Sequence, residues 1–142
     1  MPDCTFCSII AGELPAAIVG ETPEVIAFLD HSPVFPGHTL VVPRHHLVTV
    51  EDLPAGLHGP FFKAVSRVAQ AVRRGTGAQG TLVLLNNVVS QSVPHLHAHV
   101  IPRTKGDGLR GFLWPRQRYA DETARQAVRR EIAREFSQGD AS

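Results

Sequence analysis

The 142-residue chain has little of what builds disulfide scaffolds, membrane spans or nucleic-acid-binding surfaces. Two cysteines are too few for a disulfide-rich secreted fold. No run approaches the roughly 20 apolar residues that span a bilayer, and no signal-like segment opens the chain, so we expect a soluble, cytoplasmic protein without a membrane partner. The formal net charge is only +1 and the basic residues are scattered, which argues against a nucleic acid polymer as partner.

The apolar content is enough for one core. Hydrophobic residues make up 43% of the sequence, but the chain is too short for two ordinary domains, so we expect a single domain over residues 1–142. Apolar runs bounded by turn residues predict about five strands. They cover residues 18–20, 25–29, 39–42, 81–85 and 96–101.

Helical periodicity appears in two places. Apolar residues three and four apart predict one main packed helix from Leu57 to Val72, stopped by Gly75 and Gly77. A second helix begins near Asp121, a plausible N-cap, and forms a C-terminal helical extension over residues 116–142. This order of elements predicts an α+β fold with a mainly antiparallel sheet.

Three histidines alternate with apolar residues over residues 95–100. Because strand side chains alternate between faces, we expect His95, His97 and His99 in one exposed row and the apolar residues in the core. Such a row can hold a metal, move protons or attack phosphorus, and the alternative is an incidental histidine-rich strand. The outer two lie too far apart to share one ion with the third, because ligand nitrogens lie about 2.1 Å from the metal.

This segment resembles the signature of the histidine triad family of nucleotide hydrolases and transferases. Residues 30–43 resemble the family's second block, residues 91–94 lead into the triad as in the family, and the resemblance runs from about Cys4 to Trp114. It implies a histidine-triad-like fold, a small-molecule purine nucleotide as substrate, and a homodimer. The activity it implies is that of a hydrolase that cleaves a nucleoside monophosphate from its leaving group. The alternatives that stay open are a transferase that passes the nucleotide to phosphate and a noncatalytic nucleotide-binding zinc module.

The resemblance implies a role for each matching residue. His97 takes the place of the nucleophile that forms a covalent nucleotidyl-imidazole intermediate. His99 and His38 match positions that contact the phosphate, and Ser92 matches the donor toward the leaving group. Asp30 falls where the family binds ribose hydroxyls, although a turn-opening aspartate is the alternative.

The segment before the triad departs from the family pattern. Asn86, or its neighbour Asn87, and Gln91 are the expected substrate contacts there. The family usually has a glycine-containing loop in this place, whereas residues 88–90 fill a shorter gap without glycine. We therefore expect a changed leaving-group side of the pocket.

Cys4 and Cys7 form a C-x-x-C pair, which is a weak signal when it stands alone. Two unrelated thiols are the alternative, and a thioredoxin-like role is disfavoured because no strand precedes the pair. One branch of the histidine triad family joins such a pair to two histidines around a structural zinc. His46, with His45 as the alternative in register, and His95 match those positions and would close a tetrahedral site.

The other conspicuous residues gain no functional assignment from the sequence. His31 and His58 are interpreted as surface or turn residues. Phe112 and Trp114 are expected to anchor the core, with a contact to nucleotide or partner subunit as the alternative.

Overall fold

The computed structural model describes residues 3–109 and 116–139, so Phe112 and Trp114 lie outside the described residues. The chain divides into two compact units, Met1–Asp107 and Gly108–Ser142. The elements are α1 (Thr5–Ile10), β1 (Ile18–Glu21), β2 (Val25–Leu29), β3 (Thr39–Pro43), the 3-10 turn η1 (Val50–Asp52), α2 (Ala55–Thr76), β4 (Gly80–Leu85), β5 (Ala98–Arg103) and α3 (Glu122–Gly139).

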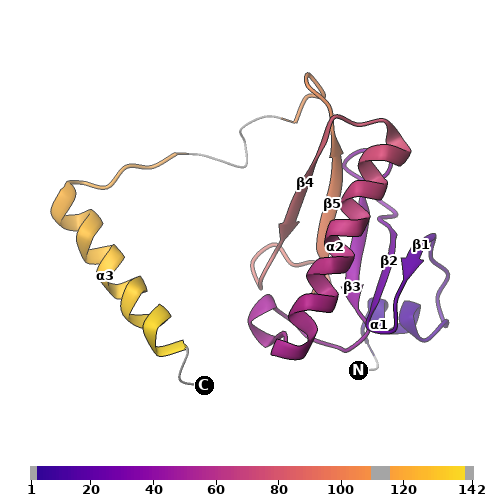
Figure 1. Cartoon of the computed structure of the whole chain (residues 1–142), viewed down its shortest axis with the longest axis horizontal. Coiled ribbons are helices and arrows are strands. Elements are labelled where there is room, and N and C mark those ends of the chain that lie inside the picture. The colour runs from indigo at the N-terminus through magenta and orange to yellow at the C-terminus, as the bar shows by residue number, and fades with distance from the viewer. Residues whose placement is uncertain (1–2, 110–115, 140–142) are drawn as a thin grey trace. The chain divides into compact units, whose positions relative to one another are not determined.

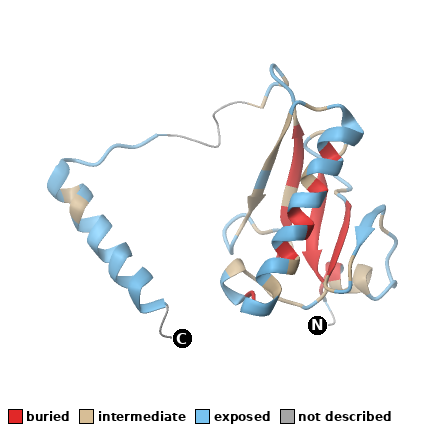
Figure 2. Cartoon of the chain, in the orientation of Figure 1, coloured by how far each residue is buried: buried red, intermediate tan, exposed pale blue. Residues whose placement is uncertain are grey.

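The first unit is built on an open five-stranded sheet in the order β1-β2-β3-β5-β4 (Figure 1). Every neighbouring pair is antiparallel, which confirms the predicted α+β class. The central strands β2 and β3 are nearly all buried, as the red ribbons of Figure 2 show. Their continuous apolar runs are typical of strands that are covered on both faces.

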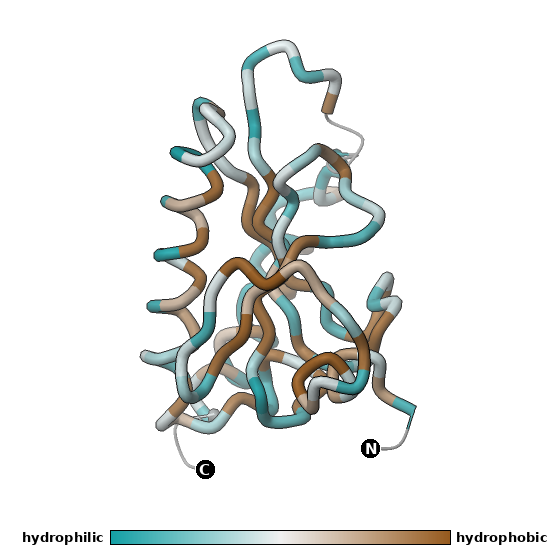
Figure 3. Tube along the Cα trace, turned by 90° about the vertical axis from the view of Figure 1, so that its right-hand side faces the viewer, coloured by the Kyte–Doolittle hydropathy of each residue, from teal (hydrophilic) through white to brown (hydrophobic). Residues whose placement is uncertain are grey.

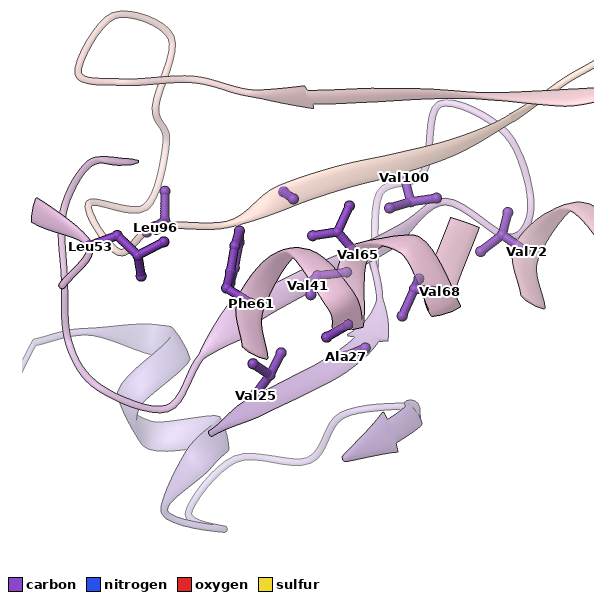
Figure 4. Close-up of a cluster of buried hydrophobic side chains, with 12 residues drawn as sticks. Val25, Ala27, Val41, Leu53, Phe61, Val65, Val68, Val72, Leu96 and Val100 are labelled. Carbon is purple, nitrogen blue, oxygen red and sulfur yellow. The ribbon is translucent and has the colours of Figure 1, made fainter. Parts of the chain in front are cut away.

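Helix α2 covers one face of this sheet and completes the larger core. Its apolar residues, among them Phe61, Val65 and Val68, lie along one side of the helix and meet Val41 and Val100 of the sheet (Figure 4). In Figure 3 the brown positions of α2 accordingly face the strands. This spacing of three and four residues is the pattern by which a helix buries one stripe.

The helix extends beyond the predicted limits at both ends. It includes Gly75, which was expected to stop it, and it ends at Gly77, whose φ of 73° is left-handed. A glycine at this position closes a helix without the steric cost that a Cβ would add.

The opposite face carries a smaller core around α1, a helix that the sequence analysis did not predict. Phe6 of α1 is buried with Phe28, Leu40 and Val42. The six-residue helix has apolar residues three and four positions apart, as a helix requires, but it is too short for this periodicity to identify it.

Strand β5 begins at Ala98, two residues later than predicted, so His95 and His97 precede it. Pro43, the last residue of β3, has no N–H to extend the ladder, and its carbonyl oxygen instead accepts a 2.8 Å hydrogen bond from the His95 ring. The alternation of faces nevertheless persists, since Leu96, Ala98 and Val100 all belong to the core under α2.

The second unit contains α3. The Asp121 carboxylate accepts the Ala124 N–H at 2.8 Å, as a residue at a helix N-terminus does, and none of the helix's described residues is buried. Val128, Ile132 and Phe136 follow one another at four-residue steps and are exposed. None of the helices among the described residues is long and apolar enough to cross a membrane.

Candidate functional site

A cleft of about 880 Å³ opens on the α1 face of the sheet. Its lining is largely apolar, with Ile9, Leu14 and Phe28, and its polar residues include Asp30, Ser92 and two histidines of the triad. The lining residues are Thr5, Phe6, Ile9, Leu14, Pro15, Ala16, Ala17, Phe28, Leu29, Asp30, His31, Leu40, Ser92, Val93, His97 and His99.

The histidines that were expected to form an exposed row are largely buried, which corrects the prediction. His95 is 0% exposed and His97 is 4% exposed, because α1 covers this side of the sheet. The Phe6 ring lies 5.0 Å from the His97 ring, centroid to centroid, at an angle of 88°. His97 therefore lines the wall of the cleft with little of its surface exposed.

A backbone carbonyl fixes which nitrogen of His97 carries the proton. Nδ1 of His97 lies 2.7 Å from the His95 carbonyl oxygen, which can only accept a hydrogen bond. Nδ1 therefore donates, and in the neutral ring Nε2 keeps its lone pair. A ring prepared in this way has a nucleophilic nitrogen available beside the cleft.

A second chain of hydrogen bonds orients His99. The Val34 N–H donates to Nδ1 of His38 at 3.1 Å, so the neutral His38 ring carries its proton on Nε2. That Nε2 lies 2.9 Å from Nδ1 of His99 and donates to it. The remaining proton of His99 is then on Nε2, where it can serve as a donor to an anionic oxygen.

Burial keeps both of these rings neutral. Desolvation lowers the pKa of His99 to about 4, and the neighbouring His97 and His38 add to the shift, whereas Asp30 opposes it. Desolvation also lowers the pKa of His38. The two rings therefore act as a pair of hydrogen-bonding groups without a net charge at neutral pH.

Asp30 lies at the edge of the cleft and is held by its own turn. One carboxylate oxygen accepts the Ser32 N–H at 2.9 Å, and the other lies 3.6 Å from Nε2 of His38. The turn-opening alternative is thus present in the structure, yet a carboxylate with its second oxygen at the cleft keeps acceptor sites free for further donors.

Three amide side chains precede the triad, and all of them hold nearby backbone; the Asn87 oxygen accepts the Val50 N–H at 2.9 Å, and Asn87 does not line the cleft. Asn86 donates to the Ser90 carbonyl at 3.2 Å. Gln91 donates to the Val48 carbonyl at 2.6 Å and accepts the Val88 N–H at 3.2 Å. Neither Asn86 nor Gln91 is among the residues that line the cleft, so their substrate contacts stay a prediction.

This shortened loop has an unusual backbone. Val88 has a φ of 70° and Ser90 a φ of 62°, both in the left-handed region that favours glycine. A β-branched residue in this region costs about 1–2 kcal/mol. The loop therefore holds two non-glycine residues in a conformation that favours glycine, and Val88 is strained by it.

Cys4, Cys7, His46 and His95 converge in a second place, and we call this set the cysteine–histidine cluster. From His95 Nδ1 the distances are 3.2 Å to His46 Nδ1, 3.4 Å to the Cys4 sulfur and 3.6 Å to the Cys7 sulfur. The Cys7 sulfur lies 3.3 Å from His46 Nδ1. His45, the alternative in register, is exposed and outside the cluster.

These distances fit a tetrahedral metal ion. Zinc bonds of about 2.3 Å to sulfur and 2.1 Å to nitrogen give tetrahedral edges of roughly 3.3–3.8 Å. His95 donates from Nε2 to the Pro43 carbonyl, so the lone pair of Nδ1 faces the thiols. Burial and the neighbouring Cys4 raise the pKa of the Cys7 thiol, and a cation between the sulfurs is what favours the thiolate form.

The structure adds residues that sequence reasoning missed. His31, interpreted as a turn or surface residue, lines the cleft next to Asp30, and α1 and the segment that follows it contribute much of the apolar lining. The adjacent Asp30 was the available signal for His31. For Phe6 the signal was its position between the two cysteines.

A model of the HIT domain family matches residues 11–106, and the chain belongs to this family of histidine triad proteins. The protein hit of Bacillus subtilis is 45% identical over 115 residues, which cover 79% of each chain. An adenosine 5′-monophosphoramidase of Schizosaccharomyces pombe is 33% identical over 114 residues, which cover 79% of this chain and 83% of that protein.

Solved structures with the same fold cover nearly the whole chain. A crystal structure from Streptococcus mutans has a TM-score of 0.87 and 33% identity, and the match covers 96% of this chain and 87% of that one. A zinc-bound histidine triad family protein from Mycobacterium smegmatis has a TM-score of 0.72 and 32% identity, with 96% and 97% covered. The cysteine–histidine cluster is thus consistent with the zinc-binding branch of the family.

Proposed function

We propose that this chain is a nucleotide hydrolase that cleaves a nucleoside monophosphate from its leaving group through a nucleotidyl-histidine intermediate on His97. The observation that carries the proposal is the 2.7 Å hydrogen bond from Nδ1 of His97 to the His95 carbonyl, since it leaves the lone pair on Nε2. The substrate is of the phosphoramidate or dinucleoside polyphosphate type. A yeast relative named as an adenosine 5′-monophosphoramidase supports this class.

The reaction takes two displacements at one phosphorus. In the first, Nε2 of His97 forms a bond to the α-phosphorus and the bond from phosphorus to the leaving group breaks; the departing atom takes a proton from solvent and accepts a hydrogen bond from Ser92. In the second, water attacks the same phosphorus, its proton is lost to solvent, and the nitrogen–phosphorus bond breaks. The nucleoside monophosphate is released and His97 is restored.

The polar and apolar parts of the cleft lining suit the two parts of a nucleotide. His99 offers its Nε2–H to a nonbridging phosphate oxygen, and His38 holds His99 in that orientation. Asp30 accepts from the ribose hydroxyls, and the apolar lining with Ile9, Leu14 and Phe28 takes a flat purine base. Asn86 and Gln91 are the proposed contacts on the leaving-group side.

The cysteine–histidine cluster would hold a structural zinc. Two thiolates and two imidazoles fill all four positions of a tetrahedral ion, so such a site contributes stability rather than an activated water. The homodimeric state and the cytoplasmic location inferred from the sequence stay predictions.

The decisive experiment traps the intermediate. Protein mixed with adenosine 5′-phosphoramidate is quenched and examined by intact mass spectrometry for the addition of one adenylyl group. We expect a transient adduct in the wild type and none in His97→Ala. His45→Ala, which removes an exposed histidine outside the cleft and the cluster, is the matched control and should form the adduct normally.

Binding of the nucleotide without adduct or turnover in the wild type would favour the noncatalytic module. An adduct that persists in His97→Ala would reject His97 as the nucleophile. An adduct that is cleared by inorganic phosphate and not by water would reassign the chain as a transferase.

A further inference from the structure

Two contacts connect the cysteine–histidine cluster to the His97 ring. On one side, Phe6 lies between Cys4 and Cys7 and places its ring 5.0 Å from the His97 ring, nearly perpendicular to it. On the other side, His95 belongs to the cluster and its carbonyl oxygen accepts the His97 Nδ1–H. These two contacts of the His97 ring therefore come from residues in the cluster or enclosed by it, and the ring's other neighbour is His99, 4.8 Å away centroid to centroid.

Helix α1 is anchored both by this cluster and by apolar packing of Phe6, Ile9 and Ile10 on the smaller core. It has only six residues, and isolated helices shorter than about 12 residues are marginal in water. Its first turn is capped by the Cys4 sulfur, which accepts the Cys7 N–H at 3.3 Å. Apart from the cluster, Phe6 is its one fully buried side chain, against the Phe28 ring at 5.4 Å and the His95 ring at 6.0 Å.

We propose that Phe6 is the positioning residue for the His97 ring, and that a metal ion in the cysteine–histidine cluster sets the alignment of His97 by fixing α1 and His95 together. The proposal rests on the proposed role of His97 as nucleophile. In this proposal the metal ion has a second role beside its structural one, because it influences the orientation of the reacting His97 ring.

Alignment matters because the attack is directional. The lone pair on Nε2 must point along the line of the breaking bond, and rotation of the ring about its attachment moves that lone pair away from phosphorus. The Nδ1 hydrogen bond restrains the ring at one edge. The Phe6 ring occupies the space into which the His97 ring would otherwise rotate, since both are 4–6% exposed and in contact.

The first test compares two phenylalanines of the same burial class. Phe6→Leu removes the ring next to His97 and keeps an apolar side chain, whereas Phe61→Leu makes the same change in the core under α2, on the opposite face of the sheet. Both are assayed with zinc loaded to the same measured stoichiometry. The readouts are kcat and KM for adenosine 5′-phosphoramidate and the Kd of adenosine monophosphate by calorimetry.

We expect Phe6→Leu to lower kcat by about tenfold or more with a small change in KM, because a displaced nucleophile slows the chemical step. Phe61→Leu should lower thermal stability and leave kcat unchanged. A Phe6→Leu variant that loses affinity for the nucleotide with an unchanged kcat would show that Phe6 is only a wall of the cleft, and it would overturn the proposal.

The second test needs no catalysis, so it separates this proposal from the proposed function. Ring ¹⁵N spectra of wild-type protein are recorded with zinc and after its removal by a chelator, and the His97 signals are assigned by their loss in His97→Ala. We expect one Nδ1–H tautomer with zinc and a mixture without it, while the methyl signals of Val65 and Val68 in the α2 core stay in place.

An unchanged His97 tautomer without zinc would overturn the coupling, whatever the activity. Collapse of the Val65 and Val68 signals together with that of His97 would also reject it, because the metal would then support the whole fold rather than the ring. A wild type that shows the tautomer change but no adduct would keep the coupling and reject the nucleophile.

Discussion

At the scale of single residues, the triad histidines differ because different groups of the chain hold their rings. A carbonyl oxygen accepts from His97, whereas the chain that starts at the Val34 N–H ends on His99. One ring therefore presents a lone pair and the other presents a proton. Two identical side chains two residues apart acquire opposite hydrogen-bonding roles from the groups that bond to their Nδ1 atoms, a backbone carbonyl for His97 and the His38 ring for His99.

The low pKa of His99 predicts a specific response to acid. Its pKa is about 4 in the folded chain and about 6.5 when exposed, so the unfolded chain takes up a proton that the folded chain refuses. The free energy of unfolding should fall as the pH is lowered from about 6.5 to 4, and less steeply in His99→Gln. Urea unfolding at a series of pH values measures the difference, and a ring titration by NMR should give a midpoint near 4. A midpoint close to 6.5 would show that the ring is not desolvated.

The same residues show what the sequence could reveal about this site. Alternation placed His95, His97 and His99 on the face opposite the core of Leu96 and Ala98, and this is the arrangement found. Their exposure was predicted wrongly, because burial depends on α1, which arrives from the other end of the chain. Local periodicity reports which residues share a face, but it contains no information about what covers that face.

At the scale of elements, α1 and the loop before the triad were the features that sequence reasoning could not build. Helix α1 is too short for a periodic signal, and a helix of six residues needs tertiary contacts, here those of the cysteine–histidine cluster and of the smaller core. In the loop, the strained φ of Val88 shows that the tertiary fold overrides local preference. Long periodic segments such as α2 were found because they carry their own signal.

The dependence of α1 on the cluster predicts the effect of losing one ligand. Cys7→Ser should abolish stoichiometric zinc and lower stability by about 3 kcal/mol, or roughly 10 °C in Tm, because the cross-link from α1 to His46 and His95 is lost. Ser8→Ala, the neighbouring change on the same helix, should bind zinc and melt as the wild type does. Metal analysis and calorimetry provide the measurements. Wild-type protein prepared without chelator and found to be metal-free would remove the zinc site.

At the scale of the whole molecule, the two faces of the sheet have separate tasks. The face under α2 carries the larger apolar core, with Phe61 and Val41 among its most buried residues. The face under α1 carries the buried histidines, the cleft and the cysteine–histidine cluster. The face under α1 can bury these polar groups because they bond to one another and to backbone carbonyls.

This separation also predicts which part of the chain is sufficient for the chemistry. Every proposed site residue and both apolar cores lie before residue 108, where the first compact unit ends. We propose one histidine triad domain with residues 116–142 as its helical extension. A chain that ends at residue 115 should therefore fold, bind zinc and form the His97 adduct at the full-length rate, as measured by urea unfolding, metal analysis and quenched mass spectrometry. A truncated chain that binds zinc with an unchanged unfolding midpoint but forms no adduct would show that the extension completes the site. The functional domain would then have to include α3, although none of its described residues is buried in its own unit.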